Sequence, residues 1–310
     1  MLFLNTTIYG VQLGLCYAVV ALGMYIAFSV LDFPDLTTDG SFPLGGVVGT
    51  ILIYKLGFHP IFALIGGFVS GMAAGAVTGV LHVKCGISKL LSGIITMTAL
   101  LSVTLALTTV LTGTGFTTTN FSYTANSFYG LFNNENGVYS SAAVIGILLL
   151  IVVVIKVLLD LYFKTKSGFM LTATGNNETL VTYLGKDSGF YKILGLAIAN
   201  GLTALSGSLY AQLTMNYDNT SGTGKVVLSL ASVIIGLALF SKAKHIKPTT
   251  SVIVGAIIYS LCLNYFTIID PNGTYLKIMN AAMFAIILII NNRLKKKKVK
   301  KADVPLKSEV

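Results

Sequence analysis

The chain has 310 residues, of which 54% are hydrophobic and 10% are charged, and its mean hydropathy is +0.81. This composition excludes an ordinary soluble domain and indicates a polytopic membrane protein. The formal net charge of +10 is concentrated in the tail after residue 292, where no aromatic residue interleaves the lysines. That distribution favours a cytoplasmic anchor on anionic membrane lipid and argues against a nucleic-acid partner.

Nine apolar segments approach the roughly 20 residues that a spanning helix needs. They cover residues 7–31, 42–57, 60–83, 87–112, 140–162, 190–212, 226–241, 249–268 and 277–292. The second and the seventh are short and flanked by glycine and polar residues, which is typical of broken helices or of helices buried in protein. We therefore expect an all-α transmembrane domain over residues 1–292, followed by a basic cytoplasmic tail over residues 293–310.

Lysines occupy alternate connections between these segments, which the positive-inside rule assigns to the cytoplasm. The lysine-rich connections lie at residues 84–89, 164–186 and 242–247, and the basic tail agrees with them. The opposite connections hold few basic residues, namely Lys55, Lys225 and Lys277. An odd number of spans with a cytoplasmic tail places the N-terminus outside. The long outside connection, residues 112–140, is as consistent with a landing surface for an external partner as with a solvated loop.

The first polar break, residues 32–40, carries three of the eleven acidic residues of the chain: Asp32, Asp35 and Asp39. Charges near a membrane are costly and call for an explanation. One interpretation is an unwound segment that lines a pathway, in which Asp39 or Ser41 caps the helix that follows. The other is an ordinary cytoplasmic turn, in which the proline, aspartate and glycine residues have their usual role, and topology alone favours this second interpretation.

A second break matches the first at an offset of 183 residues. Asp35 corresponds to Asp218, Thr37 corresponds to Thr220, and the pair Ala21-Leu22 corresponds to Ala204-Leu205. The first break follows a span that runs inward and the second follows a span that runs outward, which is the relation that an inverted repeat requires. Chance matching in an apolar sequence of low complexity is the alternative.

A polar stretch over residues 172–186 separates two apolar runs on the predicted cytoplasmic side. We expect a short helix here, because Gly175 breaks the preceding segment and Asn176 or Asn177 can cap the free N–H groups. Glu178 falls in the first turn, where the helix dipole favours an anion.

The same helix is expected to end at Gly185, because glycine commonly follows the last residue of a helix. Leu180, Val181 and Leu184 fall on one side of it, which gives the helix an apolar face. That face must be buried against a partner outside the stretch.

Motifs for catalysis and for cofactor binding are missing from the sequence. The histidines and cysteines do not cluster at metal-ligand spacings. Residues 222–225, G-T-G-K, resemble the end of a phosphate loop, but Asn219 and Val226 stand where the leading glycine and the magnesium-binding hydroxyl are needed. We therefore expect no enzymatic activity and no cofactor or metal in this chain.

Residues 173–185, A-T-G-N-N-E-T-L-V-T-Y-L-G, resemble the cytoplasmic coupling segment of ABC-importer permeases of the branched-chain amino-acid and ribose permease family. Ala173, Gly175, Asn177 and Gly185 fit the family pattern, whereas Val181 stands where alanine is usual. Residues 35–42 resemble the break after the first core helix of that family. Later core helices are similar to residues 93–97, 195–212 and 232–236. The amino-acid branch of Gram-positive bacteria is the most similar branch.

The resemblance implies a permease subunit in a bacterial plasma membrane that passes a small solute inward. A separate ATPase would hold ATP and magnesium and would dock on residues 172–186. An extracellular lipoprotein would deliver the solute, and a second permease copy or a paralogue would complete the pathway. The residues implied in coupling to the ATPase are Gly175, Asn176, Asn177, Glu178, Leu180, Val181, Leu184 and Gly185.

Polar residues within or beside the apolar segments are candidates for lining the translocation pathway. They are Asp35, Thr37, Asp39, Thr96, Asn200, Ser206, Tyr210 and Asp218. Hydrogen bonds between closely packed helices explain such residues equally well. The resemblance favours an amino acid, aromatic or branched, as the solute, with nucleosides and sugars next.

An ion-gradient-driven secondary transporter built from inverted repeats is the alternative function. Such a transporter has no evident use for a capped cytoplasmic helix at residues 172–186, so this helix discriminates between the two. A purely structural membrane protein would leave the breaks at Asp35 and Asp218 unexplained.

Overall fold

The computed structural model describes residues 2–113, 118–120, 141–241, 246–269, 275 and 278–289. Most of the predicted outside connection and the whole basic tail, residues 293–310, lie outside the described residues. The helices are α1 (Leu2–Met24), the π-helical η1 (Tyr25–Val30), α2 (Thr38–Thr50), the π-helical η2 (Ile51–Lys55), α3 (Pro60–Val83), α4 (Lys89–Thr112), α5 (Ser141–Tyr162), α6 (Lys166–Asn176), α7 (Glu178–Tyr183), α8 (Ser188–Thr214), the 3₁₀-helical η4 (Asn219–Gly222), α9 (Lys225–Leu239), α10 (Pro248–Ile269) and the segment Ile278–Ile289. Two short strands, β1 (Thr118–Asn120) and β2 (Asn216–Asp218), pair antiparallel.

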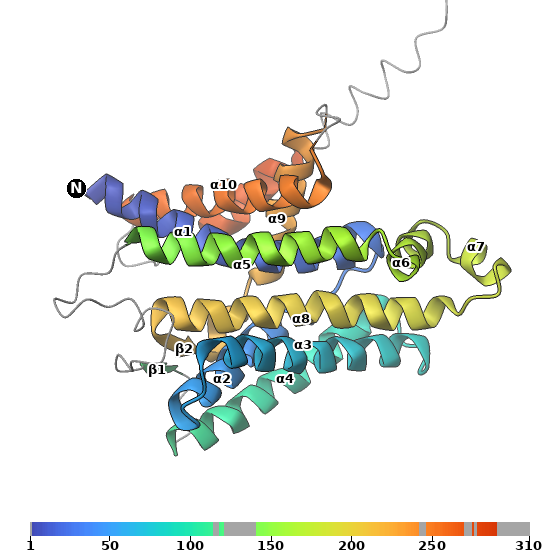
Figure 1. The fold of residues 1–310 in the computed structure, drawn as a ribbon, viewed down its shortest axis with the longest axis horizontal. Helices are drawn as coiled ribbons and strands as arrows, with labels where there is room; N and C mark the ends of the chain where they lie inside the picture. Colours follow the sequence, from blue (N-terminus) through green and yellow to red (C-terminus); the bar gives the residue numbers. More distant parts are fainter. Residues whose placement is uncertain are drawn as a thin grey trace, which may run out of the picture.

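Helix α8 lies at the centre of the bundle, between two groups of helices (Figure 1). It packs against α2 and α3 on one side and against α1 on the other, and α1 in turn contacts α5, α9 and α10. The N-terminus and the β1–β2 pair lie at one end of the bundle, whereas α6 and α7 lie at the other. The two segments predicted to face opposite sides of the membrane therefore lie at opposite ends of the bundle.

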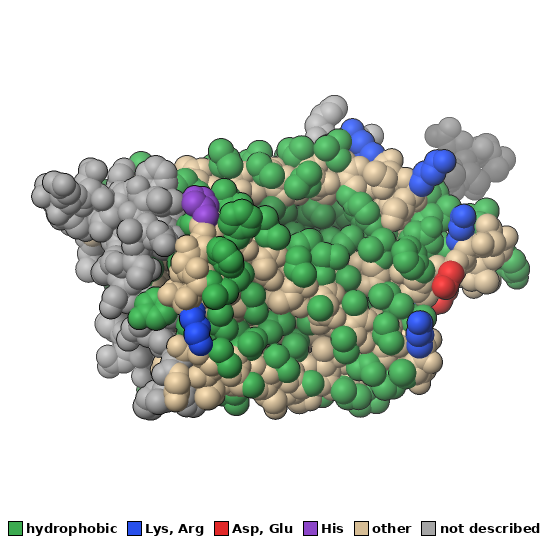
Figure 2. Space-filling view, turned by 60° about the horizontal axis from the view of Figure 1, so that its bottom comes forward, with side chains coloured by type: hydrophobic (Ala, Val, Ile, Leu, Met, Phe, Trp, Pro, Cys, Tyr) green, Lys and Arg blue, Asp and Glu red, His purple; other side chains and the backbone are tan. Residues whose placement is uncertain are grey.

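The expectation of an all-α polytopic membrane protein is confirmed. Seven described helices are long and apolar enough to cross a membrane: Phe3–Val30, Pro60–Val83, Lys89–Leu111, Ala142–Tyr162, Ser188–Thr214, Asn219–Leu239 and Pro248–Ile268. The other two predicted segments correspond to α2 with η2 and to the shorter helix Ile278–Ile289. Figure 2 shows apolar side chains over the face between the ends, with Lys and Arg towards the ends. The total of nine spans and the sidedness of the termini stay predictions.

Helix α2 is almost entirely buried, as its glycine-rich and polar flanks indicate. Glycine allows its backbone to touch α8, because a Cβ at Gly45 would overlap the carbonyl oxygen of Ala204. The same holds for α3, where a Cβ at Gly71 would overlap the carbonyl oxygen of Asn200. Small residues on α2 and α3 thus place both helices directly against the middle of α8.

Candidate functional site

A buried polar cluster joins the first break to α2, α3 and α8. The carboxylate of Asp35 accepts hydrogen bonds from the Thr37 backbone N–H (2.9 Å) and from the Asn200 amide (2.6 Å). The amide oxygen of Asn200 accepts from the Ser41 hydroxyl (2.7 Å), and the Thr37 hydroxyl lies 2.8 Å from that of Thr78. Because Asn200 lies near the middle of α8, the break reaches the interior of the bundle. The interpretation of an ordinary cytoplasmic turn is therefore wrong for Asp35 and Thr37, which are fully buried.

The second break repeats one element of this geometry. The Asp218 carboxylate accepts from the Thr220 N–H (2.8 Å), as Asp35 accepts from Thr37, which matches the predicted offset of 183 residues. Asp218 caps η4 and lies in β2, where it pairs with Thr118 of β1. The matched turns support the inverted repeat, but the structure does not bring Asp218 into the cluster around Asp35.

Asp39 connects the beginnings of two helices that are distant in sequence. It lies in the first turn of α2, and its carboxylate accepts from the backbone N–H groups of Gly224 (3.1 Å) and Val226 (2.8 Å) at the beginning of α9. The prediction that Asp39 or Ser41 caps α2 is therefore wrong. Asp39 caps α9, whose free N–H groups attract an anion, while Ser41 donates to Asn200.

Lys225, predicted to lie in an outside connection, is instead buried at the beginning of α9 with 9% of its surface exposed. Its ammonium donates to the Tyr17 hydroxyl (3.0 Å) and lies 4.1, 4.9 and 5.0 Å from the ring centroids of Tyr17, Phe42 and Tyr210. Tyr17 is near the middle of the span Phe3–Val30, so α9 also begins inside the bundle. Sequence reasoning missed this contact, because a lysine directly before an apolar segment is ordinarily expected at the membrane surface.

Of the remaining predicted pathway residues, Tyr210 lies beside Lys225, whereas Thr96 and Ser206 bond backbone carbonyls elsewhere. Tyr210 stacks on Tyr17, with ring centroids 5.9 Å apart, and therefore belongs to the surroundings of Lys225. Thr96 donates to the Ser92 carbonyl of its own helix (3.0 Å). Ser206 donates to the Cys16 carbonyl of α1 (2.7 Å). Ser206 thus makes the contact between packed helices that was the alternative explanation, whereas Thr96 bonds within α4, and the structure joins neither to the polar cluster.

The predicted cytoplasmic helix is present as two helices, α6 and α7. Asn177 caps α7 by accepting from the Leu180 N–H (3.1 Å), and Asn176 ends α6. Gly185 follows the end of α7 with φ +71°, a left-handed conformation that favours glycine. The predicted break at Gly175 is wrong, because Gly175 lies within α6. A Cβ there would overlap the carbonyl oxygen of Val30, so the glycine allows close packing of α6 on η1.

The apolar face of α7 differs from the prediction in one residue. Val181 is fully buried within this chain (0% exposed), so the prediction that it faces a partner is wrong. Leu180 and Leu184 are exposed, at 50% and 56%, and Tyr183 is exposed at 86%. Sequence reasoning missed Tyr183 because tyrosine is classed as polar by its hydroxyl, although its ring is apolar.

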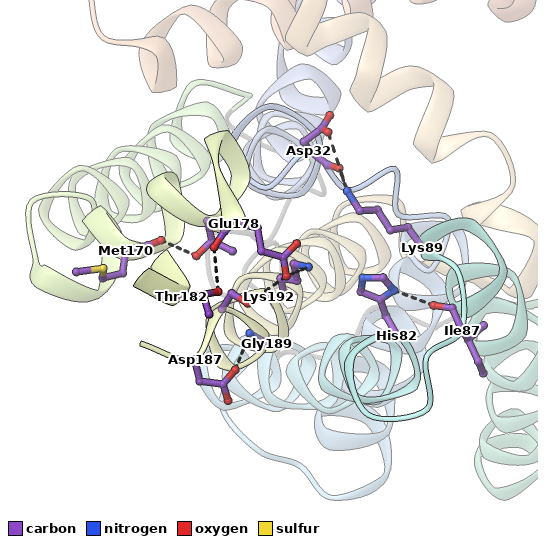
Figure 3. A network of polar contacts seen from close by, with 12 residues as sticks. Asp32, His82, Ile87, Lys89, Met170, Glu178, Thr182, Asp187, Gly189 and Lys192 are labelled. Carbon is purple, nitrogen blue, oxygen red and sulfur yellow. Dashed lines mark hydrogen bonds and ion pairs between the residues drawn. The ribbon is translucent and has the colours of Figure 1, made fainter. Parts of the chain in front are cut away.

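Glu178 fixes α7 to α8. Its carboxylate forms an ion pair with Lys192 (2.6 Å) and accepts from the Ser188 hydroxyl (3.0 Å), as Figure 3 shows for Lys192. The hydrogen bond from the Lys192 ammonium lowers the pKa of the Glu178 carboxyl below its ordinary value. Glu178 therefore holds the short helix in place, in addition to favouring its N-terminal dipole.

Comparison with known proteins assigns a family. Residues 6–290 match the family model described as "Branched-chain amino acid transport system / permease component". A tyrosine transport system permease protein of Clostridioides difficile is 39% identical over 90% of this chain and 89% of that protein. The ribose import permease protein RbsC of Escherichia coli is 23% identical over 89% of this chain and 82% of that protein. The solved structure of PsaBC from Streptococcus pneumoniae in complex with Fab matches with a TM-score of 0.38 and 18% identity, over 83% of this chain and 89% of that chain.

Proposed function

Because this chain belongs to the family of branched-chain amino-acid transport system permease components, we propose that it carries an aromatic amino acid into the cell, driven by a separate ATPase docked on α7. The family makes the chain a multi-pass plasma-membrane permease of an ABC-type system and not an enzyme. The observation that carries the docking proposal is the exposed apolar surface of Leu180, Tyr183 and Leu184 on a fixed helix.

This surface has the features of a protein-binding site. Its apolar side chains are rimmed by exposed polar residues of the same segment, such as Asn176 and Thr179. The ion pair of Glu178 with Lys192 fixes α7 before any partner binds, so less conformational entropy is lost on docking. Fully burying one leucine side chain is worth about 1.5–3 kcal/mol. Leu180 and Leu184 are about half exposed, so docking would gain about half of this value at each of them, in addition to the contribution of Tyr183.

Two relatives suggest different solutes. The more similar one is named as a tyrosine permease, which favours an aromatic amino acid for this chain. The ribose permease makes a sugar the second candidate. An ion-gradient-driven transporter, the alternative from the sequence, has no support from a family that belongs to ABC-type systems.

A second copy of the chain and an extracellular binding protein complete the proposed importer. Residues 121–140 of the predicted landing loop lie outside the described residues. The β1 strand, which comes from the same connection, pairs with β2 immediately before η4 and α9. A binding protein on this connection would therefore contact the segment that leads into the second break.

Leu184→Asp tests the docking proposal. The substituted carboxylate would have to be desolvated at the interface, so we expect loss of ATPase copurification and of transport, with normal membrane insertion. Thr172→Asp is the matched control, because it adds the same charge at an exposed position of the same stretch, on α6. If the Leu184→Asp protein still copurifies with the ATPase, α7 is not the docking site.

A further inference from the structure

The Lys225 ammonium, which no predicted role uses, is the charged group buried most closely among aromatic rings in the described structure. Its one described acceptor is the Tyr17 hydroxyl. Among the described residues, no carboxylate forms an ion pair with it. The Asp39 carboxylate is near enough to act on it electrostatically but is bonded to backbone N–H groups of α9.

Packing alone does not account for a lysine at this position. The neighbouring cluster consists of residues such as Leu13, Val20 and Leu228, among which a methionine would fit without the cost of burying a charge. An ammonium has more N–H groups than the single bond to Tyr17 uses. Ionisable residues at membrane depth commonly mark the route of a substrate. Among the described residues, the Lys225 ammonium thus has ring and hydroxyl contacts but no ion pair, which leaves it able to bind an anionic group of a ligand.

We propose that Lys225, Asp39 and the rings of Tyr17, Phe42 and Tyr210 form a substrate site for an aromatic amino acid. Lys225 binds the α-carboxylate, and Asp39 accepts from the α-ammonium group with the lone pairs that its bonds to α9 leave free. The rings pack against the aromatic side chain of the substrate. This inference rests on the proposed function and specifies the solute and its contacts.

The position of the site fits passage through the membrane. Asp39 lies at the beginning of α2 and Lys225 at the beginning of α9, so the positive ends of two helix dipoles meet there. Residues 31–37 before α2 do not form a regular helix, and the turn at residues 223–224 separates α9 from η4, so both helices begin at breaks in the helical backbone. A neutral sugar would gain little from an opposed ammonium and carboxylate, whereas a zwitterion would gain from both.

Ligand binding to the purified permease–ATPase complex in nanodiscs tests the site directly. The probes are L-tyrosine and tyramine, which has the same ring and ammonium but lacks the carboxylate, and binding is followed by ligand-observed NMR. We expect wild-type protein to bind tyramine at least about tenfold more weakly than L-tyrosine, because a hydrogen bond to a charged group is lost. If tyramine binds the wild-type complex as tightly as L-tyrosine, the inference is wrong, whatever the variants do.

Lys225→Met should bind L-tyrosine at least about tenfold more weakly while its affinity for tyramine is unchanged, which a purely structural lysine would not produce. Lys55→Met is the matched control, because the Lys55 ammonium bonds the Val110 carbonyl at an exposed position and should be dispensable. Equal L-tyrosine affinities of Lys225→Met and wild-type protein would overturn the site. Accumulation of L-tyrosine by wild-type proteoliposomes with ATPase and binding protein tests the proposed function separately, because it can succeed while the site fails.

Discussion

The Asp35–Asn200 contact makes a quantitative prediction about the stability of the bundle. Asn200→Leu keeps the approximate volume of the side chain but removes three hydrogen bonds, two of them to other side chains and one to the Leu196 carbonyl of its own helix. The Asp35 carboxylate loses its 2.6 Å donor and the Ser41 hydroxyl loses its acceptor, and both groups are buried. An unsatisfied buried polar group costs about 1–3 kcal/mol, so the loss at these two groups should lower the free energy of unfolding by about 2–6 kcal/mol.

Unfolding of the purified protein in mixed micelles, titrated with SDS, measures this loss. Thr203→Val is the control on the same helix, because the buried Thr203 hydroxyl bonds only the Ala199 carbonyl in its own turn, and the change should cost less than about 1 kcal/mol. Asp35→Asn in the Asn200→Leu background should recover part of the loss, since it neutralises a carboxylate that has lost its strongest donor. An Asn200→Leu protein within about 0.5 kcal/mol of wild type would refute the argument.

Two further predictions concern packing and pH. Gly45→Ala should lower the free energy of unfolding or prevent insertion, because the added Cβ would overlap the Ala204 carbonyl. Gly146→Ala is the control and should be neutral, because no atom lies near its added Cβ. Equal stabilities of the two variants in the same SDS titration would contradict the close approach of α2 to α8. Glu178→Gln should remove a pH-dependent contribution to the thermal stability of the purified protein. The pKa of Glu178 is lowered in the folded state, so the ionised carboxylate stabilises the fold at pH values above its ordinary pKa. This stabilisation is lost as the pH falls through the pKa of the folded state. The difference in Tm between wild type and Glu178→Gln should therefore shrink as the pH falls below about 4.5, and a difference that does not depend on pH would show that the charge of Glu178 does not contribute.

Local signals in the sequence predicted the local structure well. Hydropathy located the seven long apolar helices among the described residues, one of the two predicted caps, Asn177, begins α7, and Gly185 follows its end. The offset of 183 residues identified two turns that form the same aspartate–threonine bond. Each turn and each cap is formed by residues a few positions apart, so the local sequence is enough to predict it.

The errors all depend on contacts between distant segments. Local rules predict a helix break at Gly175, but its missing side chain serves the contact with Val30. Val181 has the periodicity of an exposed face but is covered by its own chain. The positive-inside rule assigns Lys225 to an outside connection. It uses only the position of a charge along the chain and contains no information on how deeply the side chain is buried. Asp39 caps a helix 185 residues further along the sequence, which local capping rules cannot predict.

These contacts connect α6 and α7 to the centre of the bundle. Gly175 of α6 packs on the carbonyl of Val30, the last residue of η1, and the first break follows at once. The side chains of Leu31 and Leu171 both pack against Gly195 of α8, which precedes Asn200 by more than one helical turn. Because η1 is π-helical, its backbone hydrogen bonds depart from the α-helical pattern, which is frequent at functional sites. A displacement of α6 and α7 by a docked ATPase would therefore act first on residues 31–37, then on the Asp35–Asn200 contact, and through α2 on the Asp39 cap of α9.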